Sequence, residues 1–201
     1  LMRCTRRLFV LPAMPMGDLT NTIAVGPVAS HGRRHDLGLN GDKAVLIALG
    51  GIDHHLPVDH WPRLPGIRWL VAEHWQCSHP DAIPYERFGL SFTDLLCSAD
   101  AIVTKPGYGT FTEAACNGVP VVYQRRADWP EQECLIDWLR DYGLCREITG
   151  ANLEAGNLSA PLAELWQQTP PVPQASGTRG AAELICASFR RERPPLRNAS
   201  R

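Results

Sequence analysis

Four short, largely apolar runs are spaced along the middle of the 201-residue chain. They span residues 44–49, 67–72, 101–104 and 119–123. Continuous apolar runs of this length are typical of strands that are buried on both faces of a parallel sheet. Helical patterns and short connections separate the later runs. The alternation therefore predicts a parallel α/β sheet with right-handed crossovers, in which ligands bind beyond the carboxyl ends of the strands.

The helices are predicted from capping residues and from apolar spacing. Ser91 or Thr93 is expected to cap a short helix before the run at 101–104. A second helix at 110–117 ends at Gly118, and a third at 131–141 carries apolar residues at helical spacing. Three prolines between residues 53 and 66 disfavour a long helix there. Outside this core we expect short strands at 8–11 and 23–25, a loop at 76–89, helices at 158–168 and 180–190, and a disordered tail.

Composition excludes several classes of protein. The chain is 44% apolar and 20% charged with a net charge of -1, which disfavours a nucleic-acid-binding surface. No apolar run approaches the roughly 18 residues of a membrane span, and no signal-peptide pattern is present. The seven cysteines are an odd number without framework spacing, so we predict reduced thiols and a cytoplasmic location.

The most informative segment is "KPGYGTFTEA", which enters the helix at 110–117. Unpaired N–H groups at a helix start bind anions, and Gly107 and Gly109 leave room for a phosphate beside the backbone. Thr110 adds a hydroxyl donor, and the carboxylate of Glu113 can accept hydrogen bonds from a ribose diol. Alternatively, Thr110 and Glu113 form a capping box, and the local pattern leaves both interpretations open.

Residues 92–148, "FTDLLCSADAIVTKPGYGTFTEAACNGVPVVYQRRADWPEQECLIDWLRDYGLCREI", resemble the donor-binding segment of GT-B glycosyltransferases. The similarity extends to the lipid II-forming N-acetylglucosaminyltransferases, the UDP-glycosyltransferases and the glycosyltransferase-like domain of L-arabinokinase. It implies a three-layer, Rossmann-like sheet forming one half of a GT-B fold.

The resemblance also implies roles for individual residues. Gly107, Gly109 and Thr110 would bind the diphosphate of a nucleotide sugar, and Glu113 would bind the ribose. The sugar would contact Gly50, Gly51, Glu131 and Gln132, and Trp129 and His54 are further candidates for the walls of the site. Arg125 and Arg126 lie on the loop after the strand, where a cation could face the phosphate. Arg125 and Arg126 can equally be solvated loop residues, and Trp129 can equally cap the core. Lys105, Tyr108 and the short segment between the first two runs depart from the family pattern.

For the whole chain, the resemblance implies the end of an N-terminal domain plus a linker at 1–40, a donor-binding domain at 41–190 and a tail at 191–201. The donor would be a UDP-sugar, transferred to an acceptor hydroxyl with inversion. No D-x-D pair suggests a metal-bound diphosphate, so we expect no metal and no cofactor beyond the UDP-sugar co-substrate. The general base would come from an N-terminal domain or a partner chain, so the isolated chain is expected to be inactive.

Two other functions stay open. The same fold could serve a nucleotide-sugar epimerase, or a non-catalytic subunit that binds the donor or assembles with a partner. Apolar surface left by an absent half could also support a homodimer. A zinc site at His74, Cys77 and His79 is disfavoured, because their spacing matches no standard ligand pattern.

Overall fold

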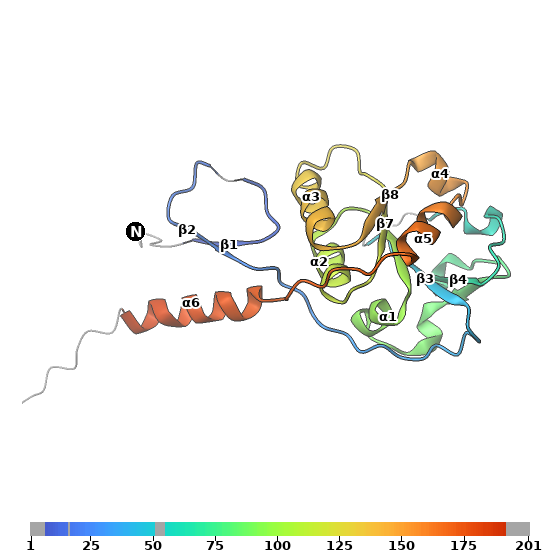
Figure 1. Cartoon of the computed structure of the whole chain (residues 1–201), viewed down its shortest axis with the longest axis horizontal. Helices are drawn as coiled ribbons and strands as arrows, with labels where there is room; N and C mark the ends of the chain where they lie inside the picture. The colour runs from blue at the N-terminus through green and yellow to red at the C-terminus, as the bar shows by residue number, and fades with distance from the viewer. Residues whose placement is uncertain (1–6, 16, 51–54, 192–201) are drawn as a thin grey trace, which may run out of the picture.

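The computed structural model describes residues 7–15, 17–50 and 55–191. Its larger part, on the right in Figure 1, is built around a six-stranded sheet. The strands are β3 (Lys43–Ile47), β4 (Ile67–Val71), β5 (Ala82–Pro84), β6 (Ala101–Thr104), β7 (Val121–Tyr123) and β8 (Cys145–Glu147). All pair in parallel, in the order β5-β4-β3-β6-β7-β8. Numbered along the chain, this is the 3-2-1-4-5-6 order of dinucleotide-binding sheets. The predicted parallel α/β fold is confirmed.

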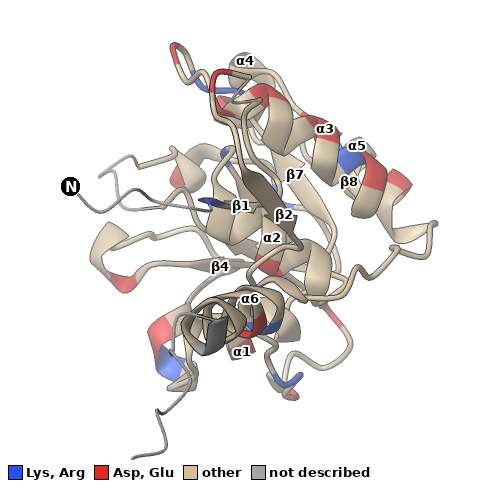
Figure 2. Ribbon diagram, turned by 90° about the vertical axis from the view of Figure 1, so that its left-hand side faces the viewer, with Lys and Arg blue, Asp and Glu red and all other residues tan. Residues whose placement is uncertain are grey.

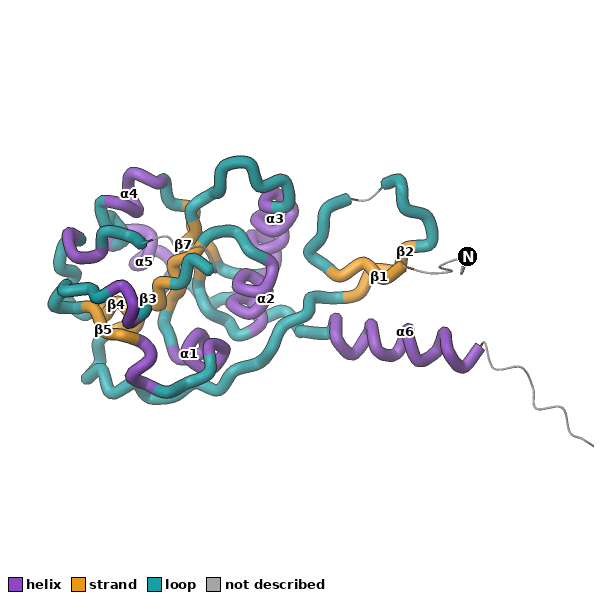
Figure 3. Tube along the Cα trace, turned by 180° about the vertical axis from the view of Figure 1, so that it is seen from behind, coloured by secondary structure: helices purple, strands orange, loops and turns teal. Residues whose placement is uncertain are grey.

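Helices cover both faces of this sheet (Figure 3). One face packs against α1 (Phe92–Ser98), α2 (Tyr108–Cys116) and α3 (Gln132–Tyr142), and the other against α4 (Gly150–Glu154) and α5 (Ser159–Trp166). Successive strand residues alternate between the two cores, so Leu46 joins the first and Val45 the second, both with no exposed surface. The central strands are largely apolar because both faces of the sheet are covered. This is the predicted three-layer arrangement.

Local signals explain several element boundaries. The hydroxyl of Ser91 accepts a hydrogen bond from the N–H of Asp94, which confirms Ser91 as the cap of α1. Between β3 and β4, the described residues form a single short 3-10 turn, Val58–His60, as the prolines there predict. The chain leaves α2 through Gly118, whose φ of 69° is the left-handed conformation expected after a helix.

The prediction of a loop at 76–89 is wrong, because this segment contains β5 and a 3-10 turn at Tyr85–Phe88. The sequence analysis also missed β8 and α4. Both missed strands are three residues long and lie at the edges of the sheet. An edge strand pairs on one side only, so "AIP" and "CRE" carry neither the length nor the apolar run that marks a central strand.

A smaller unit lies apart from the six-stranded sheet. It comprises β1 (Arg7–Val10), β2 (Thr22–Val25) and α6 (Gly177–Arg191), which lie side by side in Figures 1 and 2. The strands pair in parallel, and the N–H of Gly177 donates to the carbonyl of Pro27 at 2.9 Å where α6 joins them. The helix expected at 180–190 thus packs on β2 rather than on the large sheet. The predicted disordered tail falls almost wholly outside the described residues.

The linker from β2 to β3 follows the surface of α2 and α1. Side chains of both helices bind its backbone: Thr112 donates to Val28, Asn117 bonds Ser30 and Gly32, and Asp94 accepts from Arg33. No helix in the described part of the chain is long and apolar enough to cross a membrane.

Candidate functional site

The sheet reverses its direction of growth between β3 and β6. These strands are neighbours, but the chain proceeds outward from β3 to β5 on one side and from β6 to β8 on the other. Thr104, buried at the end of β6, donates its hydroxyl to the carbonyl of Ala48 at 2.6 Å and so ties the two strand ends together. The turns that follow, at Gly50 and Gly107, therefore meet at a switch point. This is where ligands bind in open parallel sheets.

One cavity of about 450 Å³ lies over this junction. We call it the cationic pocket; it is lined by Gly50, Lys105, Gly107, Thr110, Arg126 and Trp129, among others. No Asp or Glu is among the described residues that line it. Burial, together with the positive charge of Arg126, lowers the pKa of Lys105. The pocket therefore holds two cations whose charges the described lining residues do not neutralise.

A second cavity of about 190 Å³ shares Gly50 and Thr110 with the first. We call it the aromatic pocket, since His74, Trp75, Tyr85 and Phe92 form much of its wall. The ring of His55 stacks on that of Trp75, with 5.2 Å between centroids. Aromatic walls of this kind bind flat, partly apolar groups by stacking. The two pockets adjoin at the switch point, where Gly50 and Thr110 line both of them.

The glycine turn between them is open. Gly107 caps α2 in an extended conformation, with a φ of -164° that any residue can adopt. A Cβ placed on Gly109 would meet no atom within 4 Å. Neither backbone strain nor internal packing therefore requires glycine at Gly109. Space for a ligand beside the backbone is the remaining physical reason for it.

Helix α2 begins at Tyr108, two residues earlier than predicted. Its first internal hydrogen bond runs from the N–H of Phe111 to the carbonyl of Gly107 at 3.0 Å, so the N–H groups of Tyr108, Gly109 and Thr110 have no partner within the helix. No side chain caps them. The capping-box alternative is wrong, because Thr110 lies inside the helix instead of at its cap.

Glu113 is partly exposed on α2. Its carboxylate forms no hydrogen bond or ion pair with any residue that the structure describes. Its backbone carbonyl accepts hydrogen bonds from the backbone N–H and the side-chain amide of Asn117. A free carboxylate one turn beyond an open anion-binding turn can accept hydrogen bonds from a diol.

The other predicted residues divide into two groups. Trp129 is 37% exposed and carries the Arg126 guanidinium 3.9 Å from its ring centroid, so it is a pocket wall rather than a core residue. Gln132 uses its amide to bond the backbone N–H and carbonyl of Arg126, both at 3.0 Å, and so fixes the loop before α3. Arg125 is held by Glu133 and Glu147 and does not line the pocket. Glu131 precedes α3, and no side-chain contact is formed by its carboxylate with the described residues.

Gly51 and His54 lie outside the described residues, so their predicted roles stay predictions. Sequence reasoning overlooked Lys105, Trp75 and Tyr85 as pocket residues. Tyr85 directly follows β5, and the carboxyl end of a strand would have marked it had that strand been recognised. Burial raises the pKa of Tyr85, so its phenol stays neutral.

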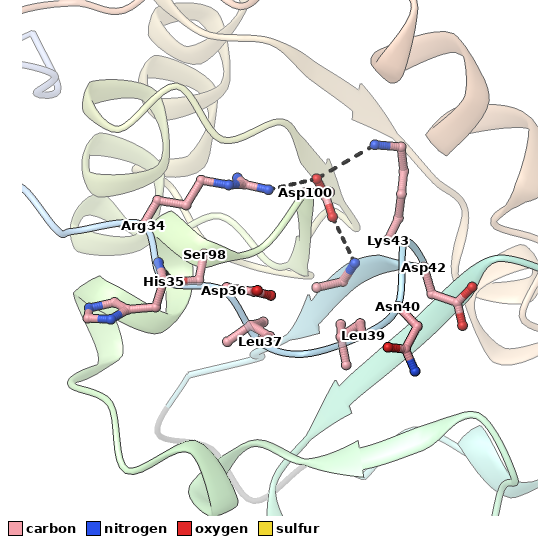
Figure 4. Close-up of a pocket in the computed structure, with 12 residues that line it drawn as sticks. Arg34, His35, Asp36, Leu37, Leu39, Asn40, Asp42, Lys43, Ser98 and Asp100 are labelled. Carbon is pink, nitrogen blue, oxygen red and sulfur yellow. Dashed lines mark hydrogen bonds and ion pairs between the residues drawn. The ribbon is translucent and has the colours of Figure 1, made fainter.

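A third cavity, of about 490 Å³, lies at the opposite edge of the sheet, where β3 and β6 begin (Figure 4). Asp100 organises it by pairing with Arg34 at 3.0 Å and Lys43 at 3.6 Å, and by accepting the N–H of Ala44 at 2.8 Å. Arg34 also donates to the carbonyl of Ala99 at 3.3 Å. These groups satisfy one another and anchor the linker to the sheet.

The described residues contain no cluster of three His, Cys, Asp or Glu side chains that could hold a metal ion. His79, from the disfavoured zinc motif, is buried, with one ring nitrogen bonded to the carbonyl of Trp61 and the other to the N–H of Asp81. The site at the switch point is thus built from cations, aromatic rings and backbone donors.

Solved structures of glycosyltransferases share this fold. The kitacinnamycin glycotransferase matches 91% of the chain at 22% identity with a TM-score of 0.65, and the calicheamicin glycosyltransferase CalG4 matches 90% at 16% identity with a TM-score of 0.60. The match covers 54% and 50% of those chains, so this chain spans about half their length. Neither family models nor curated sequences give a match. The chain has the fold of one Rossmann-like half of a GT-B glycosyltransferase.

Proposed function

We propose that the chain is the donor-binding half of a glycosyltransferase and that its donor is a UDP-sugar. The observation that carries this proposal is the pairing of an open glycine turn with the uncommitted carboxylate of Glu113 at the switch point of the sheet. A capping role would have explained Glu113 without a ligand, and the position of the helix start removes that explanation.

The diphosphate would lie against the Gly107–Gly109 turn. The three N–H groups at the start of α2 point their partial positive charge to this position, and Thr110 lies beside both pockets. Glu113 would then bind the ribose hydroxyls one turn further along α2. The ribose would follow the diphosphate along α2 because Glu113 lies five residues after Tyr108, and five residues of helix advance the chain by about 7.5 Å.

The two pockets would receive the two ends of the donor. The aromatic pocket suits the base, which would stack on Trp75 or Tyr85. The sugar would lie beyond the diphosphate, at the Trp129 side of the cationic pocket, close to the loop that Gln132 holds in place. Glu131, at the entrance to α3, would accept hydrogen bonds from sugar hydroxyls.

In the proposed reaction an acceptor hydroxyl attacks the anomeric carbon, the bond to the UDP oxygen breaks, and the configuration inverts. A base from outside this half removes the hydroxyl proton. Backbone N–H groups and side-chain cations stabilise the charge that develops on the leaving diphosphate, so the proposal requires no metal.

The remaining half would come from another domain or another chain. A two-stranded parallel sheet leaves both of its outer edges unpaired, and such pairs are rarely stable alone. Beside it, Ile185 and Phe189 of α6 are 48% and 69% exposed and lie four residues apart on one helix face. We place the contact with the second half on β1, β2 and α6.

Calorimetric titration with UDP and with inorganic pyrophosphate tests the proposal. Replacing Glu113 by Gln should remove about 2 kcal/mol of charge-assisted hydrogen bonding to the ribose, which weakens UDP roughly thirtyfold. Pyrophosphate has no ribose, so its affinity should not change. GDP and dTDP titrations would identify the preferred base.

Glu154→Gln, an exposed change on α4, is the matched control and should leave UDP binding intact. Equal losses for UDP and pyrophosphate in Glu113→Gln would refute the ribose role, and failure of every nucleotide to bind would refute the donor site. Release of UDP from the complete enzyme only when an acceptor is present would separate transfer from epimerisation.

A further inference from the structure

Two consecutive arginines in the loop after β7 have opposite environments. Arg125 is neutralised within the protein, since it pairs with Glu133 and with Glu147, the latter at 3.1 Å. Arg126 stacks on Trp129 and lines the cationic pocket, and no carboxylate among the described residues pairs with it. The sequence "RR" gives no indication of this difference.

Lys105 supplies a second charge to the same pocket. It follows β6 directly, and its Cε lies 3.7 Å from the point at which a side chain on Gly50 would begin. Its ammonium group forms no hydrogen bond or ion pair with the residues that the structure describes. The pKa of Lys105 is lowered chiefly by burial and further by Arg126, so the charged form is disfavoured when the pocket is empty.

A partly buried pair of like charges without a counter-ion costs free energy, and a bound anion removes that cost. The anion must fit beside Gly107 and Thr110, which line the same pocket at the open start of α2. A group with two or more negative charges matches two cations and the N–H donors of α2 better than a single carboxylate does. These features together specify a diphosphate.

We infer that Lys105 and Arg126 are the counter-ions of the donor diphosphate. This inference rests on the proposed function, and it assigns to the cationic pocket a ligand group and two binding residues. Lys105 departs from the family pattern, and the proposed role gives this departure a physical reason. Arg125 directly precedes Arg126 in the sequence but has no part in binding.

The experiment compares Lys105→Met, Arg126→Met and Arg125→Met, all of which keep an unbranched stem and remove the charge. Each protein is titrated calorimetrically, without divalent metal, with inorganic pyrophosphate and with UDP. We expect Lys105→Met and Arg126→Met each to weaken both ligands by about tenfold or more, and Arg125→Met to weaken them by less than about twofold. Lys105→Arg should restore most of the affinity.

Added salt should weaken pyrophosphate binding to the wild-type protein more than to either pocket variant, because the variants retain fewer charges to screen. Unchanged melting temperatures would show that the variants remain folded. Wild-type affinity for pyrophosphate in both pocket variants, or an absolute requirement for a divalent metal, would overturn the inference.

The outcomes also separate this inference from the proposed function. UDP binding that survives both substitutions would refute the counter-ions alone. Pyrophosphate binding that depends on both cations, without any preference for UDP, would refute the donor site and leave the anion site in place.

Discussion

Asn117 holds the linker against α2, and its replacement by Ala tests whether this contact stabilises the fold. Its side-chain oxygen accepts the N–H of Gly32 at 2.9 Å. Its amide donates to the carbonyls of Ser30 and Glu113, at 2.9 and 2.8 Å. One side chain therefore joins the linker to the end of α2, the helix that carries the proposed ribose-binding residue Glu113.

The expected cost follows from these three hydrogen bonds. Two are partly buried and one is exposed. At about 1 kcal/mol for each partly buried bond, and little for the exposed one, Asn117→Ala should lower the free energy of unfolding by about 2 kcal/mol. The better helix propensity of Ala offsets only a few tenths of this. For a chain of this length the melting temperature should fall by roughly 4–8 °C.

Thermal and urea unfolding measure the loss, and amide hydrogen exchange locates it. The N–H of Gly32 should exchange faster in the variant, while the amides of the central strands change only with global stability. Asn157→Ala is the control, because Asn157 is exposed and its side chain donates a single hydrogen bond, to the side chain of Asn152 at 3.2 Å. If both variants melt within about 1 °C of the wild type, the linker contact does not stabilise the fold.

Two further substitutions test other parts of the structure. Asp81 is buried and paired with two arginines, and its hydrogen bond to Arg63 holds its pKa below the usual value, so Asp81→Asn should cost about 3 kcal/mol at pH 7. Because the pKa of Asp81 is lowered on folding, its carboxylate stabilises the fold above about pH 4, and this stabilisation is lost as the pH falls through the folded pKa. The difference in unfolding free energy between variant and wild type, measured with urea, should therefore shrink on acidification. A difference independent of pH would contradict this. Tyr108→Phe removes the hydroxyl that accepts the N–H of Val28 and donates to the carbonyl of Leu11, at 2.9 and 3.0 Å. It should speed exchange of the Val28 amide and cost less than about 1 kcal/mol, with pyrophosphate affinity in calorimetry unchanged; a loss of that affinity would place Tyr108 in the binding site.

The central strands were predictable because burial on both faces leaves a continuous apolar run in their sequences. Residues 44–49 and 101–104 form strands in the middle of the sheet, and a strand covered on both faces has no position for a polar side chain that faces solvent. The edge strands β5 and β8 carry no such pattern. Their pairing depends on neighbours that lie far away in sequence, and a Pro or Arg is tolerated because one edge remains open.

The candidate site divides in the same way. The glycine turn and Glu113 are adjacent in sequence, so a local pattern identified them. The pattern could not decide between a capped helix and a ligand site, because that depends on where α2 begins. The helix begins at Tyr108, and this fact alone removed the capping box.

By itself, the sequence determined the parallel α/β class, the position of the glycine turn and the presence of a carboxylate one turn beyond it, because each depends on residues close together in the chain. Only the tertiary structure decided the strand order, and with it the switch point that brings Gly50 beside Lys105. It also decided that Arg126 and not Arg125 faces the pocket, since Glu133 and Glu147 reach Arg125 from α3 and β8. The sequence shows which residues are charged. Whether an arginine is neutralised depends on which carboxylates the fold places within reach of its side chain.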